Sequence, residues 1–162
     1  MIAGFVMSAA LPTAAQVLAL LLVGLVAGSM FGIWRGYDIT VYAPATFVEV
    51  HQGAVRGLNT LLPAMAAAGL ALVVALAVLG RNRPAVLGLY LAAALAIIVG
   101  GVITRFFNQP INDQVMGWTA ATMPGDWAAL RDGWWNWHLA RLAATLGAEL
   151  LLIAAVFADR EG

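Results

Sequence analysis

The chain has 162 residues, of which 63% are hydrophobic and only 10% carry a charge. Soluble domains have roughly 25% charged residues, and a core of this size cannot hide so much apolar surface from water. Eight acidic residues balance eight arginines and lysine is absent, which leaves no polybasic patch for nucleic acid. The composition excludes a soluble globule, indicates no nucleic-acid partner, and predicts a small integral membrane protein whose first partner is the lipid bilayer.

Missing residue types exclude several kinds of chemistry. Cysteine is absent, so the chain has no disulfides, thiolate metal sites or thiol redox chemistry. The absence of lysine removes Schiff-base catalysis, and two serines make a serine triad unexpected. The remaining candidates for a site are histidine, arginine, carboxylate and amide side chains.

Four apolar stretches are long enough to span a bilayer, which takes about 20 residues as a helix. We place them, in chain order, at roughly 13–35, 46–79, 85–107 and 134–158. The second is longer than a bilayer needs, begins amphipathic, and is expected to bend at Pro63. No linker or composition shift divides the chain. The sequence predicts an all-α, up-down four-helix membrane bundle that forms a single domain over residues 1–162.

Small residues recur every four positions along the first helix, at Gly24, Gly28, Gly32 and Gly36. This spacing lets helix backbones approach closely in lipid, so we expect the row to pack against a neighbouring helix. A short turn with Arg81 and Arg83 joins the second and third helices. Because positive charge favours the cytoplasmic side, this turn predicts a plasma or inner membrane protein with both termini in the cytoplasm.

Polar residues gather at one end of the predicted bundle. In an up-down bundle, the end of helix one, the start of two, the end of three and the start of four share a membrane face. Both histidines of the chain, most of its arginines and several amides lie in these four places: Arg35, His51, Gln52, Arg56, Asn59, Thr104, Arg105, Asn108, Asn112, Arg131, Trp134, His138 and Arg141. The opposite end has only a tight turn and a short tail. The asymmetry predicts a functional site at the polar end.

The fourth helix carries the sharpest pattern, with Trp134, His138, Arg141 and Thr145 on a single stripe. Arg141 lies roughly 10 Å along the axis from Trp134, which places it below the lipid headgroups. A charge at that depth is costly unless it faces a polar cavity or a partner. We therefore expect His138 and Arg141 to belong to a site.

Three kinds of function are compatible with this set of residues. Two histidines at similar depth on different helices are typical of axial ligands to a b-type haem. A histidine beside arginines within aromatic walls is equally suited to act as a general base next to a stabilised anion. A non-catalytic membrane protein is the third possibility. A protein-only metal site is not predicted, because two histidines are too few without carboxylate ligands.

Three blocks of sequence resemble a known family. They are Val48-Glu49-Val50-His51-Gln52 with Arg56-Gly57-Leu58-Asn59, then Asn108-Gln109-Pro110-Ile111-Asn112, and finally the block from Trp134 to Arg141. In this order they resemble the anthrone oxygenase-like family of small four-helix membrane proteins. The resemblance implies a monooxygenase that oxidises an anthrone to an anthraquinone with O2 and needs no metal or flavin. It also implies a site at His51, Asn59, Asn108, Asn112, Trp134, His138 and Arg141.

The chemistry that the resemblance implies suits these residues. An anthrone has an acidic methylene, and its anion reacts with O2 directly. His138 or His51 would be the base, Arg141 with Arg56 would favour the anion, and Asn108 and Asn112 would hold an oxygen of the substrate. A planar apolar substrate would arrive through the lipid. The substrate itself and the oligomeric state stay open.

Overall fold

The computed structural model describes residues 2–161, with side chains described for residues 11–160. Within this part the chain is helical and contains no strand. The elements are α1 (Ile2–Gly36), the 3-10 turn η1 (Ile39–Val41), α2 (Pro44–Leu58), α3 (Leu61–Leu79), α4 (Pro84–Ile103), the π-helix η2 (Thr104–Asn108), α5 (Gln109–Val115) and α6 (Trp127–Glu161). The predicted all-α fold is confirmed.

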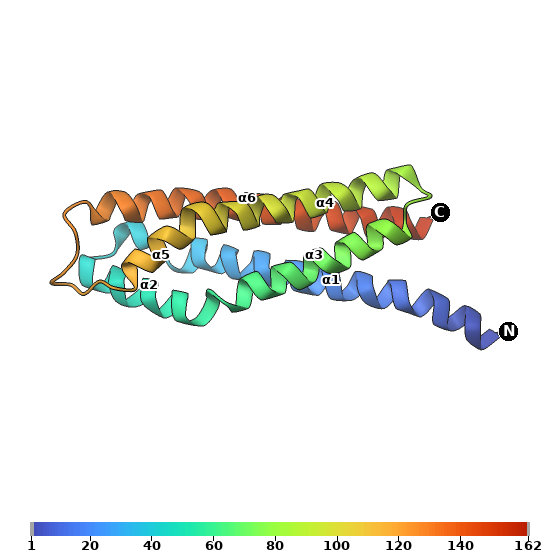
Figure 1. The fold of residues 1–162 in the computed structure, drawn as a ribbon, viewed down its shortest axis with the longest axis horizontal. Coiled ribbons are helices and arrows are strands. Elements are labelled where there is room, and N and C mark those ends of the chain that lie inside the picture. Colours follow the sequence, from blue (N-terminus) through green and yellow to red (C-terminus); the bar gives the residue numbers. More distant parts are fainter. Residues whose placement is uncertain (1, 162) are drawn as a thin grey trace.

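Four helical stretches are long and apolar enough to cross a membrane: Leu11–Val41, Pro44–Leu79, Pro84–Val115 and Trp127–Arg160. They run up and down, so that α1 begins and α6 ends at the same end of the bundle (Figure 1). Short helices α2 and α5 lie at the other end. We call this the site end, and the end with the turn between α3 and α4 the turn end. The protein is a four-helix integral membrane bundle.

The second span is interrupted, as predicted from Pro63, although the break lies a few residues before the proline. Helix α2 ends with Asn59 as its C-cap, and α3 begins after Thr60. A proline in a helix lacks the N–H that would bond to the carbonyl four residues earlier, and its ring collides with that carbonyl. For Pro63 that carbonyl belongs to Asn59, so the chain breaks there.

The third span contains a π-helical turn where a continuous α-helix was expected. It covers Thr104–Asn108 and passes directly into α5, in whose first turn Pro110 lies. The wider turn relieves the clash that Pro110 would make in a continuous α-helix. In an α-helix, Thr104 and Asn112 would lie roughly 80° apart around the axis. The π-turn inserts one residue, which changes the angle between them by about 100°. Asn112 is thereby turned toward the same side as Thr104.

The core changes its composition along the bundle. Near the turn end, one buried cluster joins α1, α3, α4 and α6, with Val73, Tyr90 and Leu152 among its fully buried members. Toward the site end, a second cluster contains Val26, Met30, Leu62 and Leu142, which come from α1, α3 and α6. No residue of α4 belongs to this second cluster among the described residues. The packing of α4 against α3 therefore ends partway along the bundle.

The predicted packing role of the glycine row on α1 is wrong for three of its four members. A Cβ added at Gly28, Gly32 or Gly36 would meet no atom within 4 Å. At Gly24 it would lie 3.3 Å from Oε1 of Glu149, so this residue does face a neighbouring helix. The buried face of α1 is a different row, in Ala19, Val23, Val26, Ala27 and Met30. Spacing every four residues defines a line along a helix but does not reveal which line faces its neighbours.

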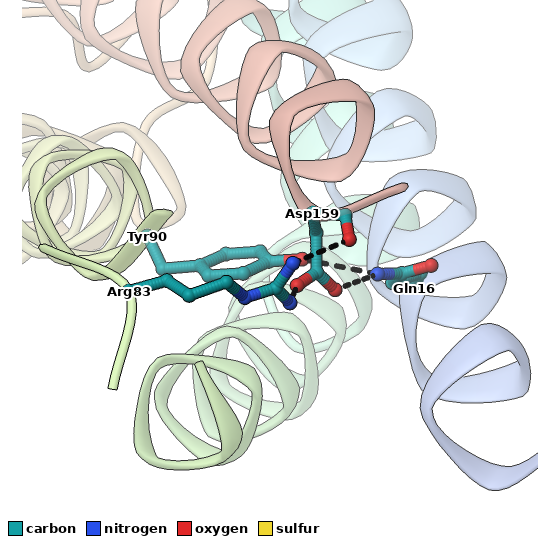
Figure 2. Close-up of polar contacts among 4 residues, drawn as sticks. All are labelled: Gln16, Arg83, Tyr90 and Asp159. Atoms are coloured by element: carbon teal, nitrogen blue, oxygen red, sulfur yellow. Dashed lines mark hydrogen bonds and ion pairs between the residues drawn. The ribbon is translucent and has the colours of Figure 1, made fainter. Parts of the chain in front are cut away.

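A polar cluster closes the turn end of the bundle, where only a turn and a tail were expected (Figure 2). The Nε2 amide of Gln16 on α1 donates to Oδ2 of Asp159 on α6 at 2.6 Å, and lies 3.3 Å from the hydroxyl of Tyr90 on α4. Arg83, in the turn before α4, forms an ion pair with the Asp159 carboxylate. Arg83 also donates to the backbone carbonyl of Asp159 at 2.7 Å. These contacts join three spans and the turn.

Candidate functional site

A cavity of about 340 Å³ lies inside the site half of the bundle, where α4 no longer shares a buried cluster with α3. Its volume is within the range of roughly 300–1,000 Å³ that is usual for small-molecule sites. Its walls come from all four spans and are mostly aliphatic. The polar or aromatic side chains that line it are His51, Asn59, Thr104, Arg105, Gln109, Asn112, Trp134, Arg141 and Thr145.

Asn112 is the centre of the hydrogen-bond network in one wall. Its Oδ1 accepts from the indole Nε1 of Trp134 at 2.7 Å and lies 3.1 Å from Nε2 of His51. Its Nδ2 donates to Oδ1 of Asn59 at 3.2 Å. Because an indole N–H can only donate, the atom of Asn112 that it meets must be the oxygen. The orientation of this amide is therefore fixed by its neighbours.

This orientation also fixes the proton on His51. Since Oδ1 of Asn112 can only accept, Nε2 of His51 carries the hydrogen in their contact. In the neutral imidazole the other nitrogen, Nδ1, then carries a lone pair, and no group within residues 11–160 bonds to it. His51 is only 3% exposed on the protein surface but lines the cavity. Its geometry is that of a base whose orientation is set by an amide.

His138 is held in a different way, by contacts at both ring nitrogens. Its Nε2 lies 3.1 Å from the backbone carbonyl oxygen of Met30, which can only accept, so Nε2 carries the hydrogen. Its Nδ1 accepts from Nε and Nη2 of Arg141, at 3.3 and 3.1 Å. The ring also stacks on Trp134, with centroids 5.1 Å apart and planes only 3° apart. His138 is therefore neutral and has no free nitrogen.

Arg141 is a buried cation without a carboxylate. It is 8% exposed, and its hydrogen bonds go to His138 and, from Nη1, to the hydroxyl of Thr104 at 3.4 Å. The guanidinium carbon lies 5.4 Å from the centre of the Trp134 ring. Across residues 11–160, no ion pair includes Arg141. Because these contacts leave some of its five N–H groups unused, the guanidinium presents free donors and an uncompensated charge to the cavity.

The structure brings together five of the eight residues predicted for the site. His51, Asn59, Asn112, Trp134 and Arg141 line the cavity. The other three lie outside its walls: Arg56 is exposed, while Asn108 and His138 are buried behind Trp134 and Arg141.

The amides differ from their predicted roles in holding an oxygen. Asn108 is fully buried, and its Nδ2 donates to the backbone carbonyl of Trp134 at 3.0 Å. Both ends of the Asn112 amide are used by His51, Trp134 and Asn59. In Asn59 the oxygen accepts from Asn112, while the Nδ2 group has no hydrogen bond to any described residue. Of these three amides, Asn59 is therefore the one whose NH2 group makes no bond within the described residues, and both of its donors are left for a ligand.

A second cavity, of about 370 Å³, lies on the other side of His51. Ile33, His51, Ala54, Leu58 and Trp134 line both cavities. The further walls of the second cavity include the exposed side chains of Tyr37 and Glu49. His51 and Trp134 therefore stand between an apolar chamber within the bundle and a chamber that reaches the polar rim.

The geometry does not fit a haem ligated by two histidines. Both nitrogens of His138 are already in hydrogen bonds, so neither is free to ligate an iron. Instead both rings contact Trp134, with centroid distances of 4.8 Å for His51 and 5.1 Å for His138. No group of three or more His, Cys, Asp or Glu side chains suitable for a metal occurs among residues 11–160.

Two contributors to the site were missed from the sequence. The backbone carbonyl of Met30 fixes the orientation of the His138 ring, and no sequence pattern predicts such a contact. The hydroxyl of Thr104 bonds to Arg141 from the first residue of the π-turn. Thr104 was placed at the polar end, but only its approach to Arg141 gives it a role. A proline six residues after Thr104, at Pro110, was the available signal for an irregular helix there.

Comparison with known protein families gives a match to the family described as anthrone oxygenase over residues 52–151, more than half of the chain. The matched region contains Asn59, Asn112, Trp134 and Arg141, and it begins one residue after His51. Neither the curated proteins nor the solved structures include a match to this chain.

Proposed function

The chain belongs to the anthrone oxygenase family, and from this premise we propose that it is a membrane oxygenase for a planar, lipophilic, anthrone-like compound. O2 is the oxidant, and the reaction uses the side chains of the protein without a metal, flavin or haem. His51 removes a proton from the substrate, and Arg141 stabilises the resulting anion. The observation that carries the proposal is the buried, unpaired guanidinium of Arg141 in the wall of an apolar cavity.

The cost of burying the unpaired charge of Arg141 favours an anionic ligand beside it. Burial of an unpaired charge costs several kcal/mol, so such residues inside a membrane protein are retained for function. An anion that forms beside Arg141 compensates this charge in a dry site, where electrostatic interactions are strong. A neutral substrate that becomes an anion during the reaction gains this stabilisation in the transition state. The arrangement therefore favours a reaction that begins with loss of a proton.

The proposed reaction balances with O2 as the single co-reactant. Nδ1 of His51 accepts one proton from the methylene carbon, and the electron pair of that C–H bond spreads over the adjacent carbonyl and rings. The carbanion combines with O2 to form a peroxide, which takes up the proton as a hydroperoxide. Loss of water then breaks the O–O bond and the second C–H bond. One oxygen atom becomes the new carbonyl of the quinone, and the other leaves as water.

The remaining side chains of the cavity position the substrate. The free Nδ2 group of Asn59 is a donor for the substrate carbonyl, whose oxygen gains negative charge after deprotonation. The indole of Trp134 provides a flat apolar wall against which a fused ring system stacks. The aliphatic lining excludes water, which would otherwise compete for the anion.

The test is oxidation of anthrone by the purified protein in detergent or liposomes with a metal chelator present. We expect O2 uptake and a quinone that contains one oxygen atom from ¹⁸O2. Arg141→Gln should lower turnover roughly 10²–10³-fold, the scale of one electrostatic contact in a dry site. Arg160→Gln, at the opposite end of the same helix, is the matched control and should keep full turnover. Equal rates for wild type and Arg141→Gln would contradict the role of Arg141.

We also propose a location and an orientation. The protein lies in the plasma or inner membrane with both termini in the cytoplasm, because the short turn with Arg81 and Arg83 lies at the end where α6 finishes. Short loops that carry arginine favour the cytoplasmic side. The site end then faces away from the cytoplasm. Protease accessibility of a tag at the C-terminus in sealed vesicles tests this orientation.

A further inference from the structure

The cavity is not closed toward the membrane. Five of its lining residues are also exposed on the outer surface of the bundle: Pro63 and Ala67 on α3, Ile98 and Gly101 on α4, and Arg105 on η2. A residue that both lines a cavity and reaches the outer surface belongs to the rim of an opening. The rim therefore lies between α3 on one side and α4 with η2 on the other.

The position along the helix places this rim within the hydrocarbon. Ile98 and Gly101 lie roughly 21 and 26 Å from Pro84, the first residue of α4, at 1.5 Å per residue. The hydrocarbon core of a bilayer is about 30 Å thick, so the two residues lie in its distal third when α4 begins at one surface. Arg105 comes one turn later, where its guanidinium reaches the headgroups. The opening therefore faces acyl chains over most of its length.

Small side chains keep the opening free. A Cβ added at Gly101 would meet no atom within 4 Å, and Ala67 on the opposite rim has a single methyl group. The core cluster at this level joins α1, α3 and α6, and no residue of α4 among the described residues belongs to it. The back wall of the cavity, opposite the rim, is formed by buried residues of α1 that include Val26 and Met30.

We propose that the gap between α3 and α4 is a lateral portal through which a neutral, planar molecule dissolved in the lipid enters the cavity. The identity of this molecule as substrate rests on the function proposed above. The apolar rim suits a solute that has already left water. Arg105 marks the headgroup edge of the portal, and Gly101 sets its width. The portal is distinct from the second cavity, which reaches the polar rim beside Glu49.

A lipid-soluble aryl diazirine tests the portal without any catalytic activity. The reagent is dissolved in liposomes that contain the protein, photolysed to a carbene, and its insertion sites are mapped by mass spectrometry. In the wild type, Val26 and Met30 should be labelled although they are 3% and 6% exposed. Phe157, which is 64% exposed near the turn end, is the internal standard for surface labelling.

Gly101→Leu narrows the portal and should reduce label at Val26 and Met30 roughly tenfold, which corresponds to about 1.4 kcal/mol of added barrier. Label at Phe157 should stay constant. Gly88→Leu is the matched control, because Gly88 is an exposed glycine of α4 with no atom within 4 Å of an added Cβ. Ala67→Leu closes the portal from the opposite rim and keeps the test valid if one variant fails to fold.

Two results would overturn the portal: an unlabelled back wall in the wild type, or undiminished label in both Gly101→Leu and Ala67→Leu. Failure of the proposed function gives a different pattern. A protein that does not oxidise anthrone but shows the expected labelling would retain the portal and lose the oxygenase assignment. In an active protein, the two narrowing variants should lower kcat/KM for bilayer-dissolved anthrone and leave kcat unchanged.

Discussion

Arg141 directs two of its nitrogens at one nitrogen of His138: Nε at 3.3 Å and Nη2 at 3.1 Å from Nδ1. The imidazole therefore acts as an acceptor that positions a cation. Its other nitrogen is used by the carbonyl of Met30. This relationship separates the two histidines, since His51 keeps a free nitrogen and His138 does not. It favours His51 as the base, whereas the sequence left the choice between them open.

Because only His51 has a free nitrogen, replacing each histidine with glutamine should affect turnover very differently. His51→Gln retains a donor to Asn112 but has no basic nitrogen, so turnover should fall roughly 10²–10⁴-fold, the usual contribution of a general base. His138→Gln retains both an acceptor for Arg141 and a donor for Met30, so turnover should stay within about tenfold of the wild type. Steady-state O2 uptake with anthrone, compared at equal protein concentration, measures both.

Two further variants sharpen this comparison. His138→Phe keeps an aromatic ring against Trp134 but cannot accept from Arg141, so it should lose far more activity than His138→Gln. The double variant His51→Gln/Arg141→Gln should be little worse than the worse single variant, because base and cation act on one step. An inactive His138→Gln beside an active His51→Gln would return the role of base to His138.

The stripe on the fourth helix shows what the sequence could predict. Trp134, His138, Arg141 and Thr145 are all buried, because a helix with 3.6 residues per turn places them on one face and polar residues there need an interior partner. The glycine row shows the limit of this reasoning. Gly28 shares a regular spacing with Gly24 but faces outward, since periodicity alone does not select the buried line.

Long-range contacts account for the side-chain roles that the sequence did not predict. The role of Asn112 depends on three partners, from α2, its C-cap and α6, which are 22 to 61 residues away in the chain. Asn108, four residues earlier, turned out to bond to the backbone of Trp134. The π-turn alters the angular position of every later residue on this span, and no periodic pattern encodes it. Side-chain roles in the site therefore required the structure.

Asn112 should determine the tautomer of His51. Asn112→Leu has a similar shape but leaves the Nε2–H of His51 and the indole N–H of Trp134 without an acceptor. We expect His51 to become a mixture of tautomers and turnover to fall, since each buried donor without a partner costs about 1–3 kcal/mol. The ¹⁵N chemical shifts of labelled histidine report the tautomer directly.

This prediction has two controls: the His138 signals in the same spectrum and a second substitution at position 112. His138 is bonded by Met30 and Arg141, so its shifts should not change. Asn112→Asp restores an acceptor and should return His51 to the Nε2–H form. A wild-type spectrum with His51 protonated at Nδ1, or an unchanged tautomer in Asn112→Leu, would refute the positioning role.

A pair of glycines tests the revised packing of α1. An added Cβ at Gly69 on α3 would lie 3.1 Å from Cγ2 of Val23, whereas one at Gly28 would meet nothing within 4 Å. Gly69→Leu should therefore force α1 and α3 apart and destabilise the fold by about 1–3 kcal/mol or more. Gly28→Leu should behave like the wild type. Thermal unfolding in detergent and the yield of monodisperse protein compare the two; equal loss in both variants would restore the original packing assignment.

The polar cluster at the turn end should stabilise the bundle without affecting the chemistry. Asp159 lies 18 residues beyond Arg141 on α6, which is roughly 27 Å along the axis. Asp159→Asn removes the ion pair with Arg83 and weakens the contact with Gln16, while the backbone carbonyl still accepts from Arg83. Because half of this network is partly exposed, we expect a loss of about 1 kcal/mol and a lower Tm.

Asp132→Asn is the matched control, since its exposed carboxylate pairs with the adjacent Arg131 at the site end. An exposed pair contributes little, so this variant should unfold like the wild type. In Asp159→Asn, kcat and KM for anthrone should be unchanged at temperatures where the protein is folded. A normal Tm would show that the cluster does not hold the spans together. An altered kcat with a normal Tm would instead couple the turn end to the site.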